Sequence, residues 1–287
     1  MTAPSVLTAH LCDDAALFPP GNAPMPQAVS AHFDHRRADY ADIVGPFVVA
    51  AGGLRALATE LIGRTIEVAI TMPSGLGCLD EVDAILRDTP GIRVAAFEIA
   101  PEPERSAADF YRALSMRAPN ADVYVEIPRD QRSDDYLREA AGSAYAAKFR
   151  TGGVTAAAYP DDAELAASIH AAVAAGVRFK ATAGLHHAIR NTDLDTGFEQ
   201  HGFLNVMLAT ARAQAGVEPD ALAEVLADRD GPRVAAALMN LETQRIELLR
   251  KAFHSFGTCS ITDPVHELSA LGVFEPSHTD LLEGHRR

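Results

Sequence analysis

Residues 145–187 read YAAKFRTGGVTAAAYPDDAELAASIHAAVAAGVRFKATAGLHH, and this stretch decides the fold. The apolar runs 145–150 and 177–183 are typical of strands that are buried on both faces of a parallel sheet. The segment 160–176 between them opens with a proline and acidic residues and closes at a glycine, which is the pattern of a helix. The stretch therefore predicts a strand–helix–strand unit with parallel strands.

The same alternation of short apolar runs and helical patterns extends over the whole chain of 287 residues. Eight strands in this length, with helices between them, predict an α/β fold, a (β/α)8 TIM barrel, as a single domain over residues 1–287. An open doubly wound sheet is the alternative, although no strand is followed by a GxGxxG or P-loop sequence. A helical insertion at about 200–253 is expected before the eighth strand, and it should contain three helices. The predicted strands are 5–11, 45–51, 65–72, 93–100, 122–127, 145–150, 177–183 and 254–261.

Composition and charge narrow the functional class. A net charge of -14 argues against a nucleic-acid partner, which would require a basic surface. The three cysteines are widely spaced, which favours a reducing compartment over a disulfide framework or a thiolate zinc site. The N-terminal residues lack a signal-peptide pattern, and no apolar run approaches the ~20 residues that span a bilayer. We therefore expect a cytoplasmic protein without a membrane partner.

Charged residues stand near the ends of four predicted strands, where a (β/α)8 enzyme carries its chemistry. Lys148 and Lys180 lie on the sixth and seventh strands, and Glu98 and Glu126 lie on the fourth and fifth. Strand alternation puts Phe149 on the opposite face from Lys148, so outward packing of the phenylalanines would point both lysines into the barrel. Two ammonium groups at close range disfavour each other's charge, so we expect one lysine to have a lowered pKa.

A neutral lysine amine is the nucleophile that forms a Schiff base with a carbonyl substrate. Glu98 and Glu126 could pair with the remaining charge or transfer protons. The same four charged residues could instead form structural ion pairs.

The turns that follow the last strands are candidates for binding an anionic substrate. Their glycines either make tight turns or present backbone N–H groups to a phosphate, which often binds at this end of the barrel. An arginine and two adjacent histidines add anion-binding or proton-transfer groups. The predicted binding residues are Arg150, Gly152, Gly153, Gly184, His186, His187 and Ser260.

The motifs resemble those of the class I, Schiff-base aldolases of the deoxyribose-phosphate aldolase type. That family has a strand-five glutamate, a strand-six lysine in a KTSTG-like motif, a strand-seven lysine in KASGG, and GTSS on strand eight. This chain has YVEIP, AKFRTGG, FKATAGLHH and FGTCS in the same order. The resemblance covers roughly residues 93–190 and 254–261. Arg150, the LHH sequence and the helical insertion depart from the family pattern.

The resemblance implies a role for each matching residue. Lys148 would be the Schiff-base lysine, and Lys180 the neighbour that lowers its pKa. Glu126 would be the strand-five acid, and Glu98 would take the place of the family's strand-four aspartate, which helps proton transfer. Gly152, Gly153, Gly184 and Ser260 would lie near a phosphate group.

We therefore expect a lyase of the aldolase type that acts on a small anionic or phosphorylated carbonyl compound, without a cofactor or metal. One alternative is a metal-dependent sugar or acid isomerase or hydrolase that uses Glu98, Glu126 and a histidine, since such ligands suit zinc or manganese. Another alternative is a non-catalytic barrel with a role in assembly. The inserted helices are a candidate interface for a homo-oligomer.

Overall fold

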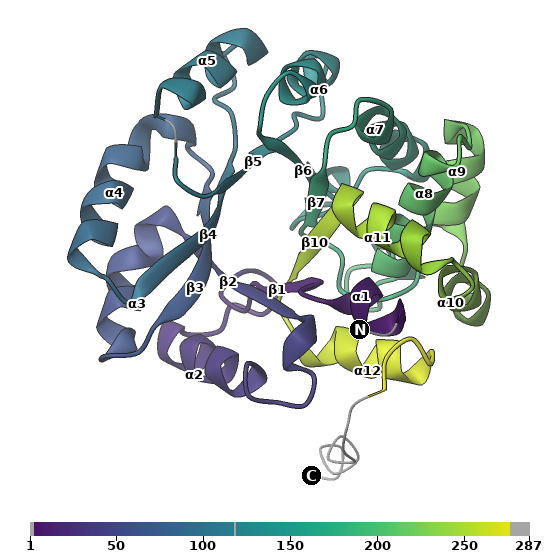
Figure 1. Cartoon of the computed structure of the whole chain (residues 1–287), viewed down its shortest axis with the longest axis horizontal. Helices are drawn as coiled ribbons and strands as arrows, with labels where there is room; N and C mark the ends of the chain where they lie inside the picture. Colours follow the sequence, from purple (N-terminus) through teal and green to yellow (C-terminus); the bar gives the residue numbers. More distant parts are fainter. Residues whose placement is uncertain (1–2, 118, 276–287) are drawn as a thin grey trace.

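The protein forms a closed barrel of eight parallel strands (Figure 1), seen in a computed structural model that describes residues 3–117 and 119–275. Neighbouring strands pair in the order β1-β10-β7-β6-β5-β4-β3-β2, and every pair in the barrel is parallel. The predicted (β/α)8 barrel is confirmed, and the open-sheet alternative is wrong. The strands are β1 (Cys12–Asp14), β2 (Val44–Ala50), β3 (Ile66–Met72), β4 (Ile92–Ile99), β5 (Asp122–Glu126), β6 (Ala146–Arg150), β7 (Phe179–Thr182) and β10 (Phe253–Thr258).

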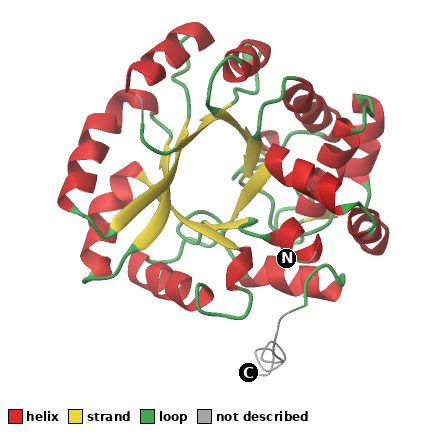
Figure 2. Cartoon of the chain, viewed as in Figure 1, coloured by secondary structure: helices red, strands yellow, loops and turns green. Residues whose placement is uncertain are grey.

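Helices surround the barrel and cover its outer face (Figure 2). In α7 the Asp161 side chain accepts a hydrogen bond of 2.8 Å from the Glu164 N–H, which satisfies one free donor of the first turn. Among the described residues, no helix has both the length and the apolar composition to cross a membrane. The helices before the insertion are α1 (Ala3–Thr8), α2 (Met25–His35), α3 (Leu54–Leu61), α4 (Leu79–Asp88), α5 (Ala107–Arg117), α6 (Ser133–Ala141) and α7 (Asp162–Ala174).

The first predicted strand, residues 5–11, is wrong. The chain forms helix α1 up to Thr8, turns at His10, whose φ is 49°, and enters β1 at Cys12. Leu7 and Leu11 are fully buried, so this apolar run packs into the core, and the Leu11 carbonyl accepts a hydrogen bond of 2.9 Å from the Phe256 N–H of β10. The true first strand is the short CDD segment, whose three residues pair with β10.

The interval between β7 and β10 holds four helices where three were expected. The third of the expected helices, over residues 232–253, divides into α10 and α11, because Asn240 ends the first and Glu242 has an extended backbone. A two-stranded hairpin, β8 (Asn191–Thr192) and β9 (Glu199–Gln200), precedes them. The helices of this interval, followed by the last outer helix, are α8 (Phe203–Gln214), α9 (Pro219–Ala227), α10 (Gly231–Met239), α11 (Thr243–Ala252) and α12 (Thr262–Ala270).

Two apolar clusters lie on the two faces of the barrel wall. The larger cluster fills the space between strands and helices and includes Phe149 and Phe179, whose ring centroids are 5.1 Å apart. The smaller cluster contains inward side chains of five strands, three of which are alanines. Small inward side chains leave space inside the barrel for longer polar ones. The smaller cluster consists of Val48, Ala69, Ala96, Tyr124 and Ala146.

Candidate active site

Lys148 and Lys180 are direct neighbours in the barrel wall, as predicted. Their Cα atoms are register partners between β6 and β7. Because Phe149 and Phe179 pack outward, both ammonium groups point into the barrel. They meet at one carboxylate, since Lys148 Nζ lies 3.3 Å from Glu98 Oε2 and Lys180 Nζ donates a hydrogen bond to Glu98 Oε1. Glu98 thus bridges the two lysines with separate oxygen atoms.

Each lysine has a second carboxylate partner. Lys180 Nζ also donates to Asp13 Oδ2, which accepts a further hydrogen bond of 2.8 Å from Ser255 Oγ. Lys148 Nζ lies 3.1 Å from Glu126 Oε2. The charges therefore alternate along a chain from Asp13 through Lys180, Glu98 and Lys148 to Glu126. Asp13, Lys180 and Glu98 are at most 2% exposed, whereas the Glu126 side chain is 22% exposed, so this chain of charges runs from the interior toward solvent.

The electrostatics of this cluster favour ionised groups at its centre. Burial raises the pKa of Glu98, but Lys180 and Lys148 outweigh it and hold the pKa at about 2. Burial lowers the pKa of Lys180, but the carboxylates of Asp13 and Glu98 raise it well above the usual value. Lys180 therefore remains an ammonium, and the expectation that one of the two lysines has a lowered pKa stays a prediction. Burial dominates at Asp13 and raises the pKa of its carboxyl despite the contact with Lys180.

Arg150 stands above this cluster at the end of β6. Its Nη1 atom lies 4.0 Å from Glu126 Oε2, the same oxygen that Lys148 contacts, and its side chain is 46% exposed. A Cβ placed on Gly153 would lie 3.9 Å from Arg150 Nη2, so the guanidinium lies over this glycine. Arg150 therefore lies beside Lys148 and Glu126, two of the predicted catalytic residues.

The loops after β6 and β7 meet at Gly152 and Gly184. A Cβ on Gly152 would lie 2.6 Å from the Tyr159 ring and 2.7 Å from the Gly184 Cα, so both glycines are needed for this close approach. Gly184 also has a φ of 75°, a conformation that favours glycine. The glycines thus have a packing role against Tyr159, and phosphate binding by Gly152, Gly153 and Gly184 stays a prediction.

The two predicted histidines have separate partners. His186 Nδ1 lies 3.5 Å from Cys259 Sγ, and burial lowers the pKa of this histidine. His187 Nδ1 donates a hydrogen bond of 2.6 Å to Glu267 Oε1 on α12, and this bond raises the pKa of His187.

Ser260 lies at the start of α12. Its Oγ atom is 3.2 Å from Thr262 Oγ1 and accepts a hydrogen bond of 3.3 Å from the Asp263 N–H. His187 and Ser260 therefore contact α12, and their binding roles stay predictions.

The site residues predicted from the sequence did not include Ser255 or Tyr124, and Asp13 was considered only as a residue that could face the pocket. Tyr124 places its ring 5.5 Å from Lys180 Nζ, and Asp13 and Ser255 complete the surroundings of this ammonium. Asp13 was expected just after the first strand, whereas it lies within β1 and points at Lys180. The neighbouring Asp14 forms a different buried pair with His32 Nδ1 at 2.9 Å.

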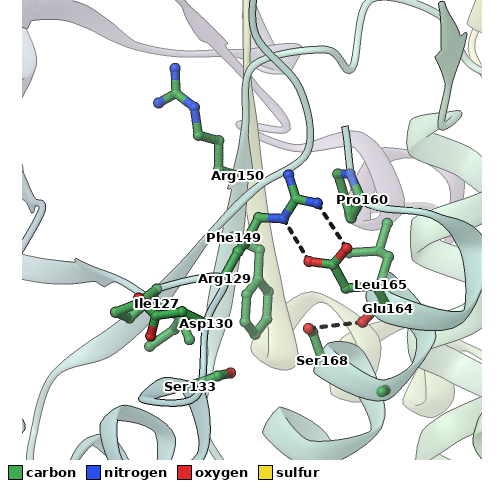
Figure 3. Close-up of a pocket in the computed structure, with 12 residues that line it drawn as sticks. Ile127, Arg129, Asp130, Ser133, Phe149, Arg150, Pro160, Glu164, Leu165 and Ser168 are labelled. Carbon is green, nitrogen blue, oxygen red and sulfur yellow. Dashed lines mark hydrogen bonds and ion pairs between the residues drawn. The ribbon is translucent and has the colours of Figure 1, made fainter. Parts of the chain in front are cut away.

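A cavity of about 370 Å³ lies beside β6, between the loops after β5 and β6 and helix α7 (Figure 3). Arg129 and Glu164 form two hydrogen bonds on its wall, of 2.6 Å and 2.8 Å, while Arg150 points away from this pair. Within residues 3–117 and 119–275, no three histidine, cysteine or acidic side chains gather in a way that could hold a metal ion.

The fold and the site define a (β/α)8 barrel with a buried cluster of lysines and carboxylates inside it. No protein-family model and no curated protein matches the chain. A tetrameric deoxyribose phosphate aldolase from Aeropyrum pernix, a solved structure, aligns over 93% of this chain and 93% of its own, with a TM-score of 0.39 and 14% sequence identity. A likeness of this size says nothing of the function of this chain.

Proposed function

We propose that the protein is an aldolase-type lyase that forms a Schiff base between Lys148 and a small anionic or phosphorylated carbonyl compound. The observation that carries the proposal is the bridge of Glu98 between two adjacent buried lysines. Ion pairs of this kind also serve structure alone, but their place inside a (β/α)8 barrel favours chemistry. Free cysteines at all three positions fit a cytoplasmic location.

The two lysines have different surroundings, and this difference supports Lys148 as the nucleophile. Lys180 is held by two fully buried carboxylates, Asp13 and Glu98, which keep it charged. Lys148 reaches Glu126, which is partly exposed and faces the solvent side of the cluster. A carbonyl compound that enters from this side meets the amine of Lys148 first.

The proposed step uses the carboxylates to move protons. Lys148 transfers a proton to Glu126 and its amine nitrogen attacks the carbonyl carbon, so a C–N bond forms and the C=O electron pair moves to oxygen. Glu126 passes two protons in turn from the nitrogen to that oxygen, which leaves as water, and the protonated imine remains. The charged Lys180 and Glu98 remain in place and stabilise the changes of charge beside them.

The test is trapping with borohydride, which reduces an imine to a stable amine. We expect a panel of small aldehydes, ketones and sugar phosphates to give an adduct on Lys148, read by intact mass and peptide mapping. Lys148→Arg is the matched control, because it keeps a positive charge beside Glu98 and lacks a nucleophilic amine. An adduct on Lys180 alone would keep the reaction class and reverse the two roles. No adduct with any compound would contradict the proposal.

The two alternatives lack a supporting observation. The carboxylates that a metal-dependent isomerase would use, Glu98 and Glu126, contact lysine ammonium groups. A purely structural barrel would fill its interior with large apolar side chains, whereas this one holds charged groups together with three alanines.

A further inference from the structure

Arg150 and Lys148 meet at the same carboxylate oxygen. Glu126 Oε2 lies 3.1 Å from Lys148 Nζ and 4.0 Å from Arg150 Nη1. The distance between Lys148 Nζ and Arg150 Nη1 is therefore no larger than the sum of these two distances. Glu126 also demonstrates that a carboxylate fits between the two cations.

The guanidinium of Arg150 has donors available for a ligand. Its contact with Glu126, at 4.0 Å, is longer than a hydrogen bond. Arg129, on the wall of the adjacent cavity, is different because two hydrogen bonds join it to Glu164. With its side chain 46% exposed, Arg150 can turn toward a bound anion.

We infer that Arg150 binds a carboxylate attached directly to the reacting carbonyl carbon, so that the substrate is a 2-oxo acid. This inference rests on the proposed Schiff base at Lys148. In a 2-oxo acid the carbonyl and carboxylate carbons are joined by one bond of about 1.5 Å. With an N–H···O bond of about 2.9 Å to the guanidinium, the whole span stays short enough to fit within the upper limit set by the two contacts with Glu126.

Three further features favour a carboxylate over a phosphate. The planar fork of a guanidinium matches the two oxygens of a planar carboxylate. The glycine pair that was predicted to bind a phosphate, Gly152 and Gly184, is packed against the Tyr159 ring. A phosphate at the far end of a sugar chain would also lie beyond the reach of a group so close to Lys148.

The covalent step is balanced without any further reactant. Lys148 passes a proton to Glu126. The neutral Glu126 side chain then no longer competes with the substrate carboxylate for Arg150. The amine nitrogen then bonds to the 2-oxo carbon, and Glu126 passes the two protons that the nitrogen loses to the carbonyl oxygen. This oxygen leaves as water, and the protonated imine remains. Arg150 holds the carboxylate throughout.

The test compares three probes in borohydride trapping on the purified full chain. These are pyruvate, acetone, which has a methyl group in place of the carboxylate, and glycerone phosphate. We expect Lys148 to trap pyruvate at least about tenfold faster than acetone, because a charge-assisted bidentate contact is worth more than one factor of ten. Arg150→Gln should abolish this preference, while Arg129→Gln, the same change on the wall of the adjacent cavity, should retain it.

The outcomes separate this inference from the function on which it rests. Equal trapping of pyruvate and acetone by the unmodified protein, or an unchanged preference in Arg150→Gln, would overturn the 2-oxo acid and leave the Schiff base standing. The 2-oxo acid would also be overturned if glycerone phosphate were trapped faster than pyruvate and this advantage were lost in Arg150→Gln. Arg150 would then bind a phosphate. Absence of trapping with all three probes and with the wider panel would overturn both.

Discussion

Two adjacent histidines, His186 and His187, differ in surroundings and should titrate at different pH. Burial lowers the pKa of His186, whereas the hydrogen bond to Glu267 raises that of His187. We expect His187 to become charged first as the pH falls, and His186 to follow at lower pH. Histidine-selective NMR titration of the two rings measures this order.

Glu267→Gln provides the control for this prediction. Loss of the carboxylate should move the pKa of His187 down toward that of an ordinary histidine and leave His186 nearly unchanged. Coincident titration of the two rings in the unmodified protein would contradict the different partners that the structure assigns to them.

At the scale of elements, the close approach of the loops after β6 and β7 depends on glycine. Gly184→Ala would bring a Cβ to 2.8 Å from the Gly152 Cα and the Tyr159 ring, in addition to the strain of a φ of 75°. We expect a loss of about 2–4 kcal/mol in the free energy of unfolding, from strain and overpacking together. Denaturant unfolding of the variant measures it.

Gly176→Ala is the matched control. Gly176 follows α7 with a φ of 68°, and a Cβ there would meet no atom within 4 Å. This variant should therefore show the backbone strain alone, about 1 kcal/mol. Equal losses in the two variants would show that the close approach of an added Cβ to Gly152 and Tyr159 does not lower the stability.

At the scale of the whole molecule, the charged cluster ties five strands of the barrel together. Asp13, Glu98, Glu126, Lys148 and Lys180 come from β1, β4, β5, β6 and β7. Glu98 is at the centre, and its pKa of about 2 in the fold lies below the ordinary value of 4.5. Its ionised form therefore stabilises the fold fully above about pH 4.5, and this contribution is lost as the pH falls toward 2.

We expect Glu98→Gln to lower the free energy of unfolding near neutral pH by about 3–5 kcal/mol, because two buried ammonium groups lose a partner. The variant should also lose part of the fall in stability between pH 4.5 and pH 2. Denaturant unfolding over this pH range tests both effects. Glu224→Gln, the same change at an exposed position on α9, should leave the stability and its pH dependence unchanged. An unchanged pH dependence in Glu98→Gln would contradict this account.

Much of the fold could be predicted from the sequence because buried parallel strands and their helices have strong local patterns. Seven of the eight strands lie where apolar runs predict them, within a few residues at each end. The first strand could not be found in this way, because CDD is too short and too polar to have a strand pattern. The break between α10 and α11 was missed for a related reason, since Asn240 to Glu242 contains neither glycine nor proline.

The sequence by itself determined the barrel and the inward direction of Lys148 and Lys180, because alternation along a strand fixes which side chains share a face. Only the tertiary structure decided their partners. Glu98 reaches both lysines, and Asp13 reaches Lys180 across 167 positions of the chain. Barrel closure makes these contacts possible, because it leaves only β10 between β1 and β7 and brings β4 within reach on the other side. Such contacts depend on strand tilt, register and side-chain length together, and no local pattern encodes them. The ionisation of the cluster follows from these contacts and could therefore not be predicted from the sequence.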